Sequence, residues 1–600
     1  MHLLWMKPLK DIYDRNEENI PENGICPIFF ARKAVGVIVS ITEDGDFVTA
    51  NTDFDKKSAI KALIPITEES NARKNGVFPH AVFDNLMYVA GDYKDYFTDN
   101  TKKYDAYLNQ LSKLIKYNKC PLYIKSIYKY IAKKTLITDL ISIKAKKIID
   151  EKSGELLFAK DGKNSLISST NIVVFKVLLK DDSNPEIWNR KDFITFYQDY
   201  YREQLSTREK KFDIISEEYA YCSKYMPSNI RFDGDMTKLI TNESPVTIGY
   251  ESALKAFNAL RWCFDLQKNA TVDSYHCALF DTAENKNINL VDLFSNGNEE
   301  SLTEELKGVL KNSIISGNRL DRFSDSDSVY FIAVDSDAPG RSSLLNFEEL
   351  SHSAFLNNLM YWQNTMFRTN RKTGEHYTPN LFSLISYSFG DIKKPDEQYP
   401  PYPRDVIKKK YFRQLLDSVI FKKPLSKDFV IAITNKVNLP QSFKSKEDFL
   451  TYLKYAEMII RKYNYDHKGD VILSLDIENT DRNYLFGRLL AVADYIEKGA
   501  AENDKHTTAA MRLWTRFRQD PANTWLKIRD SLMPYLLRTK TKKPGLYAYY
   551  NSLLADVEKM LAVETLKKNI PLSPLYIIGY NQQMDALYTK NSSEENIENN

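Results

Sequence analysis

The chain has 600 residues, of which 43% are hydrophobic and 27% are charged, the balance of an ordinary soluble globular protein. A chain of this length is long enough for about three or four domains. The formal net charge of +3 is close to neutral, so nucleic-acid binding requires local basic patches rather than a global field. The five cysteines form no CxxC pair, and no apolar run reaches the roughly 18 residues of a membrane span. These features favour a cytoplasmic protein without disulfides or a zinc ribbon.

The first half of the chain mixes predicted strands with predicted helices. Residues 26–67 are rich in β-branched side chains, and the segment EDGD at 43–46 predicts a hairpin turn between two strands. The segments NIVVFKVLL (171–179) and VYFIAVDSD (329–337) predict further strands. Residues 101–152 are rich in lysine and have the pattern of helices. A turn-rich segment then leads into a predicted helix at 247–264.

Beyond about residue 445, nearly every segment has helical periodicity. Apolar residues between 485 and 496 are spaced four, three and four apart, which places them on one helix face. Gly487 and Arg488 lie inside this helix, although a helical glycine costs about 1 kcal/mol relative to alanine. We expect Gly487 to allow close packing of another helix, and Arg488 to project toward nucleic acid or a neighbouring subunit.

The predicted fold class is α+β, with mixed α/β N-terminal and central regions followed by an all-α C-terminal helical bundle. The expected domains are an α/β N-terminal domain at 1–245, a central α/β region at 246–445 and the helical bundle at 446–590. The Pro- and Lys-rich stretch at 392–424 favours a boundary in this part of the chain. The polar tail 591–600 is expected to be disordered.

Two aspartates at the end of a predicted strand are the feature most typical of an enzyme. Asp335 and Asp337 supply carboxylates of the kind that hold a divalent metal for phosphoryl chemistry. A solvated turn after a strand is the other interpretation. The sequence contains no HExxH motif and no nucleotide-binding glycine loop. We therefore expect no metal, no cofactor and no catalytic residues.

Two segments have the composition of nucleic-acid contacts. In the loop 71–85, Arg73, Lys74, Asn75 and Asn85 lie near Gly76. Arg, Lys and Asn side chains recognise base edges, and glycine lets a backbone approach a groove. The loop is therefore a candidate DNA-binding element, with an ordinary basic turn as the alternative.

The second segment, 511–543, contains nine Lys and Arg residues against two Asp residues, so its net charge is nine minus two, or +7. The predicted C-terminal basic face comprises Arg488, Arg512, Arg516, Arg518 and Lys527. Trp514, Phe517 and Trp525 are interleaved with these cations. Either the rings stack on unpaired bases while the cations bind phosphates, or the rings belong to the core and the cations form a solvated face.

Four segments occur in a characteristic order: RKNGVFPHAVFDNLMYVAG, TIGYESALKAFNALRWCF, YLFGRLLAVADYIEK and PLYIIGYNQQMDALY. Together they resemble the large subunit of the type I-C CRISPR Cascade complex. The central signature is carried by Tyr250, Glu251, Lys255, Asn258, Ala259, Leu260, Arg261 and Trp262, and the C-terminal one by Gly579, Tyr580, Gln583, Leu587 and Tyr588. The chain departs from the family pattern at Met584, where arginine is usual, and at Phe257, where histidine is common.

The resemblance implies a non-catalytic subunit that recognises the motif flanking a target in double-stranded DNA. It also implies roles in opening the duplex, stabilising the R-loop and presenting the displaced strand to a nuclease-helicase recruited in trans. The implied partners are the guide RNA (crRNA) complex, the DNA target with its displaced strand, and the backbone, guide-handle-binding and small subunits of Cascade. Two alternatives stay open: a metal-dependent nuclease using Asp335 and Asp337, and a structural scaffold without DNA contact.

Overall fold

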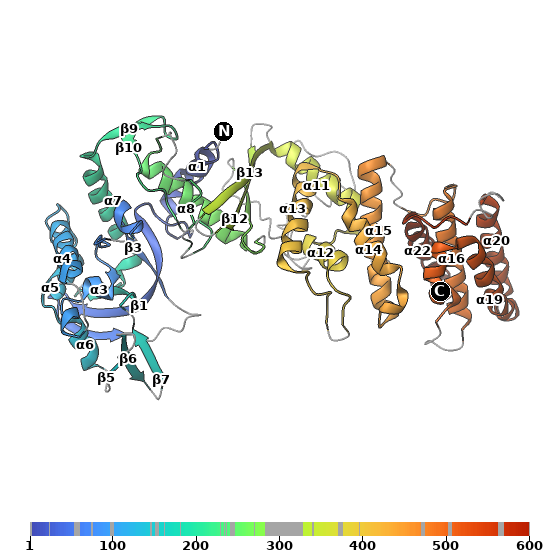
Figure 1. The fold of residues 1–600 in the computed structure, drawn as a ribbon, viewed down its shortest axis with the longest axis horizontal. Coiled ribbons are helices and arrows are strands. Elements are labelled where there is room, and N and C mark those ends of the chain that lie inside the picture. Colours follow the sequence, from blue (N-terminus) through green and yellow to red (C-terminus); the bar gives the residue numbers. More distant parts are fainter. Residues whose placement is uncertain are drawn as a thin grey trace. The chain divides into compact units, whose positions relative to one another are not determined.

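The computed structural model describes residues 3–22, 24–52, 60–73, 76–96, 101–143, 147–150, 155–160, 163–167, 169–180, 182–228, 230–232, 235, 237–240, 247–268, 271–281, 328–338, 341–369, 376–394, 397–469, 474–501, 507–561 and 569–598. These residues fall into two compact units (Figure 1). Unit 1 contains the described residues up to 268 together with 274–281 and 330–349, and unit 2 contains the others. Unit 1 combines sheets and helices, whereas unit 2 is almost entirely helical, which confirms the predicted α+β class.

Unit 1 is built around a five-stranded sheet of β1 (Phe30–Thr42), β2 (Phe47–Asn51), β3 (Lys61–Pro65), β4 (Asp84–Asn85) and β8 (Ile172–Leu178). The strand β1 runs antiparallel to β2 and β3 and parallel to β8, and β4 is antiparallel to β8. Gly45 has a φ of 78° in the turn between β1 and β2, so the hairpin predicted at 43–46 is confirmed. The strands predicted at 171–179 and 329–337 are also present, as β8 and β12.

The helices of unit 1 are α1 (Met6–Asn16), α2 (Glu68–Asn71), α3 (Leu86–Val89), α4 (Thr101–Ile115), α5 (Leu122–Ala132), α6 (Leu136–Ser142), α7 (Lys191–Ser206) and α8 (Tyr250–Leu266). Its other strands are β5 (Lys147–Asp150), β6 (Glu155–Lys160), β7 (Lys163–Ile167), β9 (Lys210–Asp213), β10 (Glu218–Tyr221), β11 (His276–Asp281), β12 (Ser328–Ala338) and β13 (Arg341–Ser351). They form three small sheets, β5-β6-β7, β9-β10 and β11-β12-β13.

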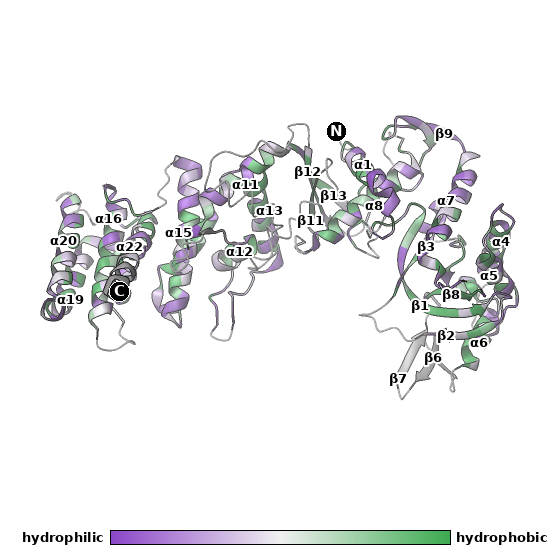
Figure 2. Cartoon of the chain, turned by 180° about the vertical axis from the view of Figure 1, so that it is seen from behind, coloured by the Kyte–Doolittle hydropathy of each residue, from purple (hydrophilic) through white to green (hydrophobic). Residues whose placement is uncertain are grey.

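The core of unit 1 lies along β1, which is coloured hydrophobic over much of its length in Figure 2. Val37, Ile38 and Val39 are successive residues and all are buried, so this strand is covered on both faces. The helix α5 packs against β1 and β8. A strand covered on both faces explains the continuous run of β-branched side chains in the sequence.

The helix α8 belongs to unit 1, so this unit extends to residue 268 and not to the predicted boundary at 245. The ring of Phe257 in α8 lies 5.4 Å from that of Trp5, which precedes α1. Lys255 Nζ donates to Asp14 Oδ1 at 2.5 Å. The packing of α8 on α1 therefore joins segments more than two hundred residues apart, which a boundary drawn from local composition cannot reveal.

Unit 2 contains α11 (His352–Met366), α12 (Leu381–Phe389), α13 (Asp405–Phe421), α14 (Lys427–Val437), α15 (Lys446–Lys468), α16 (Arg482–Ala500), α17 (Ala509–Arg512), α18 (Trp514–Gln519), α19 (Pro521–Lys542), α20 (Pro544–Met560) and α22 (Leu575–Glu598), with the short strands β14 (Arg368–Thr369) and β15 (His376–Tyr377). The helical character predicted beyond residue 445 is confirmed. Tyr576 Oη in α22 donates to Asn438 Oδ1 at 2.7 Å, so helices on both sides of the predicted boundary at 446 pack together. The helix α22 also continues through Glu598, where the composition predicted a disordered tail; no Gly or Pro interrupts it after Gly579.

Across the described residues, no helix combines the length and apolar character needed to cross a membrane.

Candidate nucleic-acid interface

The loop that follows α2 is closed at its base by a buried ion pair. Arg73 Nη1 and Nη2 donate to Asp84 Oδ2 and Oδ1 at 2.8 and 2.5 Å, and Nη1 also donates to Phe78 O at 2.8 Å. Asp84 is fully buried, and its carboxylate also accepts from the backbone N–H groups of His80 and Asn85, each at 2.7 Å. Each carboxylate oxygen therefore holds one Arg73 bond and one backbone bond, which ties the two ends of the loop together.

Arg73 was predicted to contact DNA, but the structure commits its side chain to closing the loop. Burial acts to lower the pKa of Arg73, but the Asp84 carboxylate outweighs this effect and the pKa is raised. The guanidinium also lies 4.5 Å from the centroid of the Tyr88 ring. A buried carboxylate requires a cationic partner, and that requirement accounts for Arg73.

The other predicted residues of this loop differ in what the structure describes. Lys74 and Asn75 lie outside the described residues. Gly76 has a φ of 131°, which favours glycine, and Phe78 beside it is 42% exposed. Asn85 is half-buried, and its side-chain amide makes no hydrogen bond within the described part of the chain. Asn85 therefore stays a predicted DNA contact.

The helices α16 and α22 pack closely through two glycines. A Cβ atom on Gly487 would overlap the carbonyl of Tyr576, at 2.8 Å from its carbon, and would lie 2.9 Å from Tyr580 N. A Cβ atom on Gly579 would overlap the carbonyl of Tyr484 in the same way, at 3.0 Å from its carbon. Side chains at either position would hold the two backbones apart. The predicted close approach at Gly487 is confirmed.

Arg488 was predicted to lie on an exposed basic face, but the structure places it inside the bundle. Its exposure is 3%, and its Nε donates to Gln583 Oε1 in α22 at 3.0 Å. Burial lowers the pKa of Arg488. The reason for the difference is that α16 is buried around most of its circumference, so the residue after Gly487 faces protein.

The four remaining cations of the predicted basic face lie nearer to solvent. Arg512, Arg516 and Lys527 are exposed, and Arg518 is half-buried. Arg512 Nη1 donates to Thr507 O at 3.1 Å, which keeps this side chain near the start of α17. Exposed arginine and lysine side chains are suited to phosphate contacts along a nucleic-acid strand.

The aromatic residues interleaved with these cations belong to the core. Trp514 and Phe517 are fully buried and Trp525 is 2% exposed. The Trp514 ring centroid lies 5.3 Å from that of Phe449 and 5.0 Å from that of Tyr580. Rings packed in this way cannot stack on bases, so the core interpretation holds for the aromatics of this segment.

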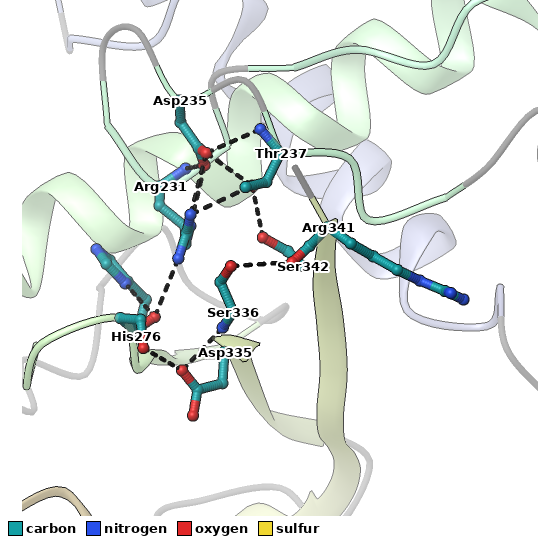
Figure 3. Close-up of polar contacts among 9 residues, drawn as sticks. Arg231, Asp235, Thr237, His276, Asp335, Ser336, Arg341 and Ser342 are labelled. Atoms are coloured by element: carbon teal, nitrogen blue, oxygen red, sulfur yellow. Dashed lines mark hydrogen bonds and ion pairs between the residues drawn. The ribbon is translucent and has the colours of Figure 1, made fainter. Parts of the chain in front are cut away.

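The aspartate of the alternative nuclease site is buried and hydrogen-bonded (Figure 3). Asp335 is 1% exposed, and its Oδ1 accepts from Ser274 Oγ at 2.6 Å and from Ser336 N at 2.8 Å. The side chain of Asp337 lies outside the described residues. Among the residues that the structure describes, no group of three or more His, Cys, Asp and Glu is placed to hold a metal ion. The Asp335 carboxylate therefore joins β12 to the segment before β11.

A second buried ion pair, between Arg231 and Asp235, lies beside the sheet β11-β12-β13 and helps to attach the segment that carries it to this sheet. Arg231 Nε and Nη2 donate to Asp235 at 3.0 and 3.1 Å, and Thr237 Oγ1 donates to Asp235 Oδ1 at 2.7 Å. Thr237 Oγ1 also lies 2.6 Å from Ser342 Oγ in β13. The Arg341 side chain is exposed and points away from this network in Figure 3. These contacts describe a structural link between a loop and a sheet.

A comparison with known protein families gives one match over nearly the whole chain. The family model described as CRISPR-associated protein (Cas_Csd1) matches residues 9–588. The chain belongs to this family. No curated protein matches the chain significantly. The match confirms the resemblance seen in the sequence, and it identifies a CRISPR-associated Cascade subunit.

In this Csd1-family chain, the central signature helix α8 supports the fold. Besides the Lys255 bond to α1, Asn258 Nδ2 donates to Cys26 O at 2.8 Å, which fastens α8 to the segment before β1. Glu251 pairs with Arg202 of α7 at 3.3 Å. The residues that carry the resemblance therefore hold α1, α7 and α8 together.

Sequence reasoning missed two residues at the base of the loop. His80 is fully buried, and its Nε2 lies 2.8 Å from Lys33 Nζ on β1. Lys33 lies outside the segments that carry the resemblance or the candidate nucleic-acid contacts, and His80 lies in the segment RKNGVFPHAVFDNLMYVAG without a spacing that indicates chemistry. The sequence shows only a lysine at the start of a β-branched run and a histidine between Pro79 and Ala81, so no pattern brings them together.

Proposed function

We propose that this Cascade subunit recognises the short motif flanking a DNA target, helps to open the duplex and stabilise the R-loop, and presents the displaced strand to a separate nuclease-helicase. In RNA-guided complexes of this kind, guide pairing recognises the target sequence and protein recognises the flanking duplex. The observation that carries the proposal is the closure of the loop by Arg73 and Asp84. Two fixed ends reduce the conformational entropy that a loop loses when it enters a groove.

Two side chains of this loop suit contact with a duplex. The half-buried amide of Asn85 has the donor and acceptor pair that matches adenine in the major groove. The exposed ring of Phe78 is the type of apolar side chain that inserts between base steps and unstacks them. Motif recognition and duplex opening would then occur at neighbouring positions of one loop.

The exposed cations of unit 2 suit the displaced single strand. Arg512, Arg516 and Lys527 face solvent, and phosphate contacts from such side chains act on all sequences alike. The proposed partners are those of a Cascade large subunit: the guide RNA, the DNA target, the other subunits and the nuclease-helicase. We propose that the chain itself is not an enzyme and acts in the cytoplasm. The hydrogen bonds that commit Asp335 to the fold support the first of these two statements.

The test uses the complex assembled with guide RNA and targets that differ only in the flanking motif. Asn85→Ala should reduce discrimination between correct and incorrect flanks by about 1–3 kcal/mol. Phe78→Ala should retain discrimination but slow duplex opening, measured by the fluorescence of a 2-aminopurine next to the flank. Lys113→Ala, which removes an exposed lysine of α4, serves as the control. If both loop variants discriminate between flanking motifs and open the duplex as the parent does, this loop does not recognise the flanking motif.

A second measurement addresses the displaced strand. The triple variant Arg512→Ala, Arg516→Ala, Lys527→Ala should bind single-stranded DNA more weakly, with the slope of log K against log salt reduced by about 0.7 for each lost phosphate contact. Arg488→Ala should leave this slope unchanged, because Arg488 is buried. If the triple variant binds single-stranded DNA with the parent's affinity and salt slope, these cations of unit 2 do not contact the displaced strand.

A further inference from the structure

Lys33 and His80 form an unusual contact at the base of the flanking-motif loop. Lys33 lies on β1 and is half-buried, and its Nζ is 2.8 Å from Nε2 of the fully buried His80. The other ring nitrogen of His80, Nδ1, is 2.8 Å from Ser70 Oγ. The histidine therefore bridges a strand and a helix beneath the loop.

The hydrogen bonds around Ser70 determine which ring nitrogen of His80 carries the proton. Ser70 Oγ donates to Thr67 O at 3.2 Å and accepts from Thr67 N at 2.9 Å. Because the hydroxyl proton is used on Thr67 O, Ser70 Oγ accepts from Nδ1–H of His80. Nε2 then carries the lone pair and accepts from the Lys33 ammonium. Burial, together with the nearby cations Lys33 and Arg73, holds the pKa of His80 well below its ordinary value, so the ring is neutral.

The site has one cation more than its carboxylate can pair. The charged groups that face Lys33 are Arg73 and Asp84, and the Asp84 carboxylate already accepts two bonds from Arg73 and two from backbone N–H groups. Within the described part of the chain, Lys33 uses one of its three N–H donors, on His80. An ammonium without a counter-ion in such a place is unfavourable unless a ligand supplies the missing negative charge.

We propose that Lys33 binds a backbone phosphate of the flanking duplex and that His80 positions the ammonium for this contact. The inference rests on the proposed function of the loop. Lysine binds phosphate as a point charge, and phosphate contacts fix the register of a protein on DNA without reading its sequence. Lys33 would thus set the position from which Asn85 meets a base edge.

The test replaces Lys33 by methionine in the assembled complex, which removes the charge and keeps the length of the side chain. Binding to target duplexes should weaken roughly tenfold, by the same factor for correct and incorrect flanks. The slope of log K against log salt should decrease by about 0.9. The unfolding temperature of the free chain should stay the same or rise, because a cation without a counter-ion has been removed. Lys113→Ala should change neither binding nor stability.

A pH profile separates positioning of the ammonium from a purely structural role. Burial and the neighbouring Arg73 lower the pKa of Lys33 to about 8. Binding by the parent should therefore weaken as the pH rises above 8, because the neutral amine must take up a proton to hold a phosphate. Lys33→Arg stays charged in this range and should show a flatter profile. His80→Leu removes the acceptor that stabilises the Lys33 ammonium and leaves an apolar side chain in its place, so the pKa of Lys33 should fall and the binding profile should shift to lower pH.

The outcomes distinguish this inference from the function on which it rests. If the parent complex shows no preference for any flanking motif, the proposed function fails. If the parent shows a preference but Lys33→Met keeps the parent's affinity and salt slope, only the inference fails. A Lys33→Met variant that binds weakly and also unfolds at a lower temperature would assign Lys33 to the fold and overturn the phosphate contact.

Discussion

Replacing Gly487 by alanine tests the packing of α16 on α22 directly. The added Cβ would lie 2.8 Å from Tyr576 C and 2.9 Å from Tyr580 N. Carbon atoms in ordinary contact are about 3.5–4.0 Å apart, so the two helices must separate by roughly 1 Å. Both obstructing atoms are backbone, and no rotamer change can relieve the overlap.

The size of the effect follows from two opposing contributions. Overpacking a core costs about 1–3 kcal/mol, and a clash between backbones belongs at the upper end. Alanine returns about 1 kcal/mol through its helix propensity. The net loss in the free energy of unfolding is therefore about 2 kcal/mol. Amide hydrogen exchange in α16 and α22 should be about thirtyfold faster, while exchange in α4 of unit 1 serves as an internal reference.

The matched control is Gly499→Ala in the same helix, where an added Cβ would have no atom within 4 Å. This variant should be neutral or slightly more stable than the parent. If Gly487→Ala exchanges as slowly as Gly499→Ala, the close approach of the two helices is refuted. A glycine inside this buried helix would then have no packing role.

Three further predictions concern charged residues. Arg73→Ala should destabilise unit 1 by about 3 kcal/mol in urea unfolding, because Asp84 is left buried without its cation, whereas Asn85→Ala should leave stability unchanged. Asp335→Asn should leave degradation of targets by the recruited nuclease intact; normal assembly with abolished degradation would support the nuclease alternative. Lys33 has a pKa of about 8 in the folded chain, below the roughly 10.4 of an unfolded lysine, so the unfolded state binds more protons between these values. Unit 1 should therefore gain stability as the pH rises through this interval, and Lys33→Met should flatten that gain in unfolding experiments at pH 7.5 and 9.5.

Local sequence patterns were sufficient to predict the secondary-structure elements, but they were insufficient to predict the contacts between those elements. The turn at 43–46, the strand at 171–179 and the helix around Gly487 each follow from a few neighbouring residues, and the structure contains all three. The position of the half-buried Arg73 side chain depends on Asp84, eleven residues away, and the burial of Arg488 depends on Gln583 in another helix. A cation beside a glycine has the same appearance in a sequence whether it faces solvent or a buried acceptor.

The same dependence on distant partners explains why the loop suits its proposed role. A subunit that leaves sequence recognition to a guide RNA needs few contacts with the flanking duplex, but those contacts must be held in one geometry. Asp84 fixes both ends of the loop through four hydrogen bonds, and the Lys33–His80–Ser70 chain fixes a cation beside them. These groups come from β1, α2 and the loop, so the position of the loop is determined by the sheet on which it rests. Weakening the bonds of Asp84 should then reduce discrimination between flanking motifs more than it reduces the affinity for DNA as such, whereas loss of Lys33 should weaken binding to all flanks alike.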